Sequence, residues 1–149
     1  MHRWIPGSLL ALSLFAALPA FAQQPSAAAI PRTAAPEGAK VYFISPTNGA
    51  EVSSPIVVRF GLSGAGVAPA GVNTPKTGHH HLLVDGALPA NMGLPFPNDA
   101  THLHFGGGQT ETTLTLPPGK HTLQLVLGDD KHIPHEPPIV SEKITITVK

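Results

Sequence analysis

Proline and glycine recur at short intervals along this chain, and their spacing limits its fold more than any other feature. Of its 149 residues, 17 are proline and 15 are glycine. Both residue types interrupt helices, and no long stretch after the N-terminal region has the periodicity of an amphipathic helix. Short segments with alternating apolar and polar side chains lie between them, which is the pattern of β-strands. We therefore expect an all-β protein.

Seven segments show this alternation, and the fourth of them is either a strand or an ordered loop. They cover residues 40–46, 55–64, 79–86, 101–108, 110–119, 120–129 and 140–149. About seven strands in a domain of this length is typical of an immunoglobulin-like antiparallel β-sandwich. A small closed β-barrel is the alternative architecture.

The N-terminal region has the features of an export signal. Arg3 precedes the apolar run "LLALSLFAALPA", which is too short to span a bilayer, and the small residues "AFA" precede Gln23. We expect residues 1–22 to be a signal peptide and the mature protein to be periplasmic, with secretion as the alternative. Residues 23–39 are rich in alanine and proline, which predicts a flexible linker, and residues 40–149 form a single domain.

Composition excludes several classes of function. The chain has no cysteine, which rules out disulfides, thiol catalysis and thiolate metal sites. Removing Arg3 with the signal peptide takes the nine lysines and arginines to eight, against nine acidic residues. A chain so close to neutral has no electrostatic footprint for nucleic acid, and nothing after the signal peptide is apolar enough to span a membrane. No nucleophile motif or acid–base pair stands out, so we expect no enzyme activity.

Histidines are concentrated in the domain, and strand parity predicts where they point. Side chains alternate between the two faces of a strand. Leu82 and Val84 therefore place His80 on the core face, and His79 and His81 on the opposite face.

The same argument applies to the second cluster of histidines. Leu103 and Phe105 share one parity, which leaves His102 and His104 together on the other face. His121 shares the parity of the neighbouring leucines, and we expect it, like His80, to be a core histidine.

Two His-x-His pairs on neighbouring strands suit a metal ion. The Cα atoms within each pair would lie about 7 Å apart, so the two imidazoles can converge on one ion. Imidazole nitrogens suit divalent zinc, copper or nickel, and we expect copper or zinc. The pair in the loop before the last strand either caps this site or belongs to an interaction loop. The expected metal ligands are His79, His81, His102, His104, His132 and His135.

An ordered set of motifs runs through the domain: "VYFISPTNGAEVSSP", "TGHHHLLVD", "HFGGGQTE", "PGKHTLQLVLGD" and "HIPHEPPIVSEKITITV". With these motifs, residues 40–149 resemble an exported bacterial domain of unknown function, family 4399. The resemblance implies a small exported all-β domain and brings no established activity. The residues that it marks are His79, His80, His81, His104 and Gln109.

Two functions are consistent with the sequence. The first is a module that binds, buffers or delivers a divalent metal ion, which requires several imidazole nitrogens around a common point. The second is a structural or interaction module of the cell envelope, with an unidentified envelope protein as its partner. In that case the histidines and Gln109 form a buried hydrogen-bond network that pins the loops over residues 65–78 and 86–100.

Overall fold

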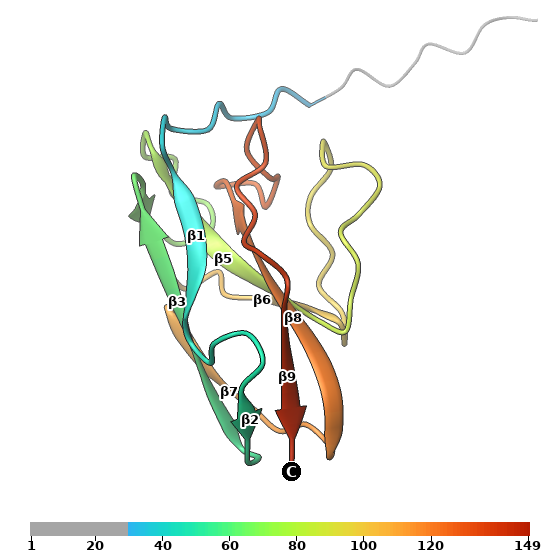
Figure 1. Ribbon diagram of the computed structural model, residues 1–149. Coiled ribbons are helices and arrows are strands. Elements are labelled where there is room, and N and C mark those ends of the chain that lie inside the picture. Colours follow the sequence, from blue (N-terminus) through green and yellow to red (C-terminus); the bar gives the residue numbers. More distant parts are fainter. Residues whose placement is uncertain (1–29) are drawn as a thin grey trace, which may run out of the picture.

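The computed structural model describes residues 30–149, and in this part of the chain the protein is all-β (Figure 1). Nine strands form two sheets there. The expected signal peptide, residues 1–22, and the first part of the expected linker, residues 23–29, lie outside the described residues. No helix in residues 30–149 is long and apolar enough to cross a membrane.

The smaller sheet has three antiparallel strands. Its order is β1 (Lys40–Ser45), β3 (Ile56–Ser63) and β7 (Glu111–Leu114). Ile56, Val58 and Phe60 alternate with exposed residues along β3, so the apolar face of this sheet is buried and the other face is exposed.

The larger sheet carries the histidine-rich strands. It consists of β2 (Glu51–Val52), β9 (Ile144–Val148), β8 (Gly119–Gly128), β5 (Thr77–Val84) and β4 (Gly66–Val67), in that order, with β6 (His102–His104) also paired to β5. Strand β5 is antiparallel to β8 and β6, whereas the short pairs β2–β9 and β4–β5 are parallel.

The two sheets pack face to face around one apolar core. Val58 and Phe60 from the smaller sheet meet Leu82, Leu125 and other apolar side chains of the larger sheet. The sheets are open, so the prediction of a β-sandwich is confirmed and the barrel alternative does not describe this chain. Each of the seven predicted segments overlaps one of the longer strands. The other two, β2 and β4, have two residues each and are too short to show an alternating pattern.

The larger sheet is also covered on its outer face, away from the sandwich core. Residues 78–84 of β5 are all buried, on both faces of the strand. A second apolar cluster of Leu83, Phe96 and Val126 forms there, with Met92 and Val140 packed against it. The long connection between β5 and β6 supplies Phe96 and so provides part of this cover.

The segment before β1 lies within the expected linker, residues 23–39. Its residues 32–36 contact the connection between β8 and β9. Ala34 forms a parallel bridge with Glu136, and the Ala35 amide donates to the Glu136 carbonyl at 2.8 Å. Figure 1 shows this segment crossing one end of the sandwich before it enters β1. Backbone hydrogen bonds hold it there, and composition does not reveal them.

Truncation of a leucine in the sandwich core should destabilise the protein strongly. Leu125 has no exposed surface, so we expect Leu125→Ala to lower the free energy of unfolding by about 2–5 kcal/mol. The matched control is Leu88→Ala, at a side chain that is 38% exposed, which should cost much less. Urea denaturation measures both, and equal losses would contradict this description of the core.

Candidate metal centre

Strand β5 places two of its histidines on the outer face of the larger sheet. His79 and His81 lie there with Leu83 and are almost completely buried. His80 points the other way, as its parity predicts, and its ring centre lies 5.2 Å from that of Phe60 in the sandwich core. The Nε2 atoms of His79 and His81 are 3.1 Å apart.

Strand β6, which pairs with the edge of β5 opposite β8, adds a third imidazole. His104 is paired with His81 in the antiparallel register, so both side chains project from the same face. The Nε2 atom of His104 lies 3.2 Å from Nε2 of His79. The His104 side chain is half-buried, so it lies where the cluster approaches the surface.

The connection between β8 and β9 supplies the fourth imidazole through a tight turn. The Asp129 side chain accepts hydrogen bonds from the Lys131 and Ile133 amides, each at 2.9 Å, and the His132 amide donates to the Asp129 carbonyl at 3.0 Å. This turn holds His132 at a φ of 66°, a left-handed conformation that non-glycine residues rarely adopt. The half-buried His132 thereby brings its Nδ1 atom to 3.1 Å from Nε2 of His79.

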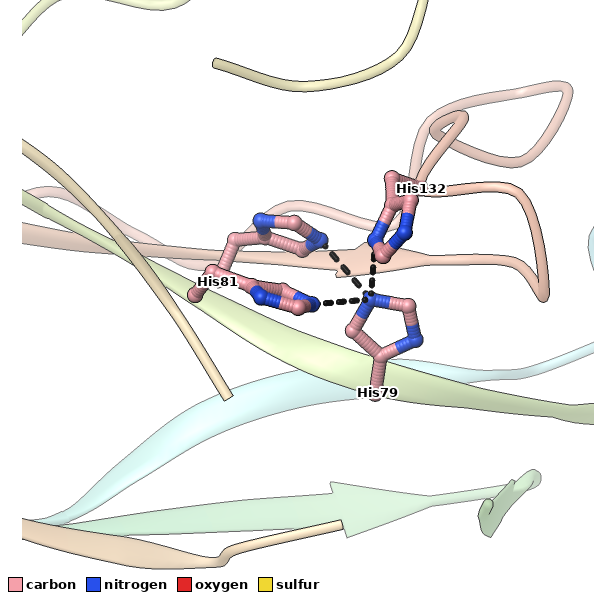
Figure 2. A group of neighbouring side chains, drawn as sticks. His79, His81 and His132 are labelled. Atoms are coloured by element: carbon pink, nitrogen blue, oxygen red, sulfur yellow. Dashed lines mark hydrogen bonds between the residues drawn. The ribbon is translucent and has the colours of Figure 1, made fainter. Parts of the chain in front are cut away.

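The four imidazoles converge on one point. One nitrogen atom from each of His79, His81, His104 and His132 lies within 4.8 Å of the other three. Figure 2 shows the rings of His79, His81 and His132 turned toward one another, with the marked interactions meeting at His79. A tetrahedral zinc ion with Zn–N bonds of about 2.05 Å would hold its ligand atoms about 3.3 Å apart. The contacts of 3.1–3.2 Å to His79 are close to that spacing.

Hydrogen bonding alone does not satisfy this cluster. A nitrogen of a neutral imidazole is either a donor or an acceptor, yet His79 Nε2 faces three other imidazole nitrogens at once. Within residues 30–149, the buried Nδ1 atoms of His79 and His81 have no hydrogen-bond partner. The side chain of Gln109, which the network hypothesis includes, accepts a hydrogen bond from the Gly107 amide.

Burial keeps the imidazoles in the form that binds metals. Desolvation, reinforced by the neighbouring imidazoles of His132 and His104, lowers the pKa of His79 to about 4. Desolvation and the same cluster lower the pKa of His81 to about 2, and burial also lowers the pKa of His104. Neutral rings at pH 7 keep their lone pairs, which a metal ion needs.

Two glycines leave room for the rings. A Cβ atom at Gly106 would lie 2.3 Å from Cε1 of His104, and a Cβ atom at Gly128 would lie 2.8 Å from Nε2 of His81. Any larger side chain at either position would have to displace an imidazole of the cluster. Gly106 belongs to the glycine run that follows His104 in the sequence. From the sequence alone, that run indicates only a turn.

Two of the six expected ligands lie outside the cluster. His102 shares the face of His104, but its Nδ1 lies 2.9 Å from Asp99 Oδ1 and its Nε2 lies 3.0 Å from the Ala87 carbonyl oxygen. His135 is buried, and its Nδ1 lies 3.4 Å from the Leu127 carbonyl oxygen. Oxygen atoms of the protein therefore engage both rings.

His121 also differs from the expectation of a core histidine. It is half-buried near the start of β8, where its Nδ1 lies 2.7 Å from Asp85 Oδ2 and its Nε2 lies 2.9 Å from the Pro117 carbonyl oxygen. Its hydrogen bond to Asp85 raises the pKa of His121.

Comparison with known proteins identifies a family. Residues 58–149 match the model of a domain of unknown function, DUF4399. No curated protein is similar enough to count as a match. Among solved structures, the chain is similar to the fibronectin(III)-like modules of Clostridium thermocellum CbhA, at 12% identity and a TM-score of 0.34, over 72% of this chain and 92% of that one.

The metal-free protein should lose stability on acidification. Burial lowers the folded-state pKa values of His79 and His80 to about 4, whereas unfolded histidine titrates near pH 6.5. Between those values the unfolded chain binds more protons, so stability is complete above about pH 6.5 and falls toward pH 4, by at most roughly 1.4 kcal/mol per pH unit for each histidine. His121, with its raised pKa, offsets part of this loss. Urea denaturation with a chelator present should show the slope.

The matched variant for this measurement is His80→Leu, which removes one buried imidazole from the core and should make the pH dependence shallower. An unfolding free energy that stays constant from pH 7 to pH 4.5 in the parent protein would contradict the buried, neutral state of these histidines.

Proposed function

The chain belongs to the DUF4399 family, and we propose that it is an exported module that binds one divalent transition-metal ion through His79, His81, His104 and His132. The observation that carries this proposal is the convergence of four imidazole nitrogens within 4.8 Å of one another. Neither packing in a hydrophobic core nor a hydrogen-bond network requires the lone pairs of neutral imidazoles to face one another. A metal ion, by contrast, accepts one lone pair from each of the four rings.

The ligand set selects the class of metal. All four candidate ligands are imidazoles, and magnesium and calcium prefer oxygen ligands instead. The chain has no cysteine to favour a soft monovalent ion. Zinc and divalent copper remain the best matches.

The spacing of the nitrogens around His79 favours zinc over copper. In a square-planar site, the usual preference of divalent copper, each nitrogen has two neighbours at about 2.8 Å and one at about 4.0 Å. His79 Nε2 instead has three neighbours at 3.1, 3.1 and 3.2 Å, as at one corner of a tetrahedron. We therefore propose zinc as the preferred ion and copper as a competitor.

The site suits holding an ion rather than catalysis. Four protein ligands complete a tetrahedral shell, whereas catalytic zinc sites keep one position open for water or substrate. His79 and His81 are buried, while His104 and His132 are half-buried, so the ion would enter and leave past the latter two. Binding, buffering or delivery of the ion is the role that follows.

The charge of the ion has a partner in the protein. Four neutral imidazoles leave both positive charges of the ion uncompensated. Asp129 is buried beneath the turn that carries His132, and its charge acts on His79 in the direction that raises the pKa. Its carboxylate would stabilise the bound cation in the same way.

We also propose that the module acts in the periplasm, with secretion as the alternative. The support is the charged, apolar and small-residue pattern of residues 1–22. Delivery of the ion would require a partner protein in the cell envelope that accepts it.

Loss of the buried ligand pair should abolish specific binding. We expect residues 23–149 to bind one equivalent of zinc at sub-micromolar Kd, and His79→Asn/His81→Asn to bind none, measured by elemental analysis and calorimetric titration. The matched control is His102→Asn, since His102 lies on the same face but outside the cluster. Absence of binding in the parent chain, or equal losses in both variants, would overturn the proposal.

Filling the space beside one ligand should weaken binding without removing any imidazole. Gly106→Ala would place a methyl group 2.3 Å from His104 Cε1, so the ring must turn away. We expect a loss of about 10- to 100-fold in zinc affinity with the fold retained. Gly66→Ala is the control, because its Cβ would come no closer than 3.3 Å to the Thr77 side chain. Unchanged affinity in Gly106→Ala would contradict the assignment of His104 as a ligand.

A further inference from the structure

We propose that residues 32–36, which precede the sandwich, form a strap that positions His132 for metal binding, and that Thr33 is its positioning residue. This inference rests on the proposed metal-binding function. It concerns residues outside the 58–149 range that matches the family model. It makes the affinity of the site depend on the segment through which the domain joins the preceding chain.

One carboxylate connects the strap to the turn that carries His132. The Thr33 hydroxyl donates a hydrogen bond to Asp129 Oδ2 at 2.7 Å. The other oxygen of the same carboxylate accepts from the amides on either side of His132, those of Lys131 and Ile133, each at 2.9 Å. Asp129 is 3% exposed whereas Thr33 is exposed, so water is excluded from the carboxylate end of these hydrogen bonds.

Further contacts hold the end of the same connection. Arg32 Nε donates to the Pro134 carbonyl at 3.1 Å, and the Arg32 guanidinium also bonds the His135 carbonyl and pairs with the Glu136 carboxylate. The Glu136 amide donates to the Thr33 carbonyl at 2.9 Å. The strap therefore contacts the turn at Asp129 and also contacts residues 134–136, which follow the turn.

The conformation of His132 explains why such support is needed. A histidine at a φ of 66° does not rest in its preferred backbone region, and such a conformation persists only where its surroundings hold it. The Phe96 amide, which donates to the His132 carbonyl at 2.7 Å, is a second support from the connection between β5 and β6. The other three candidate ligands lie on paired strands, so His132 is the one whose position depends on loop contacts.

The experiment compares hydroxyl-deleting and hydroxyl-retaining variants of Thr33 in residues 23–149. We expect Thr33→Val to lose about tenfold in zinc affinity and Thr33→Ser to keep the parent affinity. The matched control is Thr101→Val, which removes a similar hydrogen bond, 2.9 Å from Thr101 Oγ1 to Asp99 Oδ1, away from the cluster.

Two further readouts separate positioning from general stability. With cobalt(II) as the probe, the visible absorption of Thr33→Val should shift from the parent spectrum toward that of His132→Asn, which lacks the fourth imidazole. In the metal-free protein, the Lys131 and Ile133 amides should exchange hydrogen faster in Thr33→Val than in the parent.

The outcomes distinguish this inference from the proposed function. If the parent binds zinc and Thr33→Val matches it in affinity, cobalt spectrum and amide exchange, the strap is overturned and the metal site stands. If the parent binds no metal, the proposed function fails and the strap fails with it. If Thr33→Ser is as impaired as Thr33→Val, the hydroxyl of Thr33 is not the positioning group.

Discussion

Desolvation of the His79 and His81 imidazoles is the constraint on which the rest of this site depends. Both rings are almost completely buried on the outer face of the larger sheet, and burial keeps them neutral. Buried polar groups need partners, yet the Nδ1 atoms of these two rings have none within the described residues. Their Nε2 atoms face only other imidazoles. A metal ion would bond to the Nε2 atoms of both rings, in place of their contacts with other imidazoles, and the proton of each ring would then lie on Nδ1.

The sandwich supplies both the rigidity and the cover that such a site needs. Strand β5 is paired on both edges, with β8 on one side and β4 and β6 on the other, so His79, His81 and His104 are fixed by sheet register. Phe96 packs 5.0 Å from the His81 ring and excludes water from one side. A site held on strands and covered by loops suits an ion that is bound firmly and exchanged through the loop side.

Strand alternation was enough to predict much of this arrangement. The β-sandwich followed from short alternating segments, and parity correctly placed His79 and His81 opposite His80. Parity could not separate His102 from His104, because the two share a face. The difference lies in Asp99, which engages His102 through a turn that alternation does not describe.

The positions of the loop histidines and of the strap could not be predicted from sequence patterns. His132 and His135 lie in a connection without periodicity, and only the backbone turn at Asp129 decides which of them reaches the cluster. Residues 32–36 have the composition of a linker, and hydrogen bonds with residues distant in sequence fix them.

The most direct test of the account is X-ray absorption spectroscopy of the zinc-loaded protein at the zinc edge. It should show four nitrogen neighbours at about 2.0 Å with the scattering pattern of imidazoles. A shell of oxygen atoms, or one with fewer than three imidazoles, would contradict it.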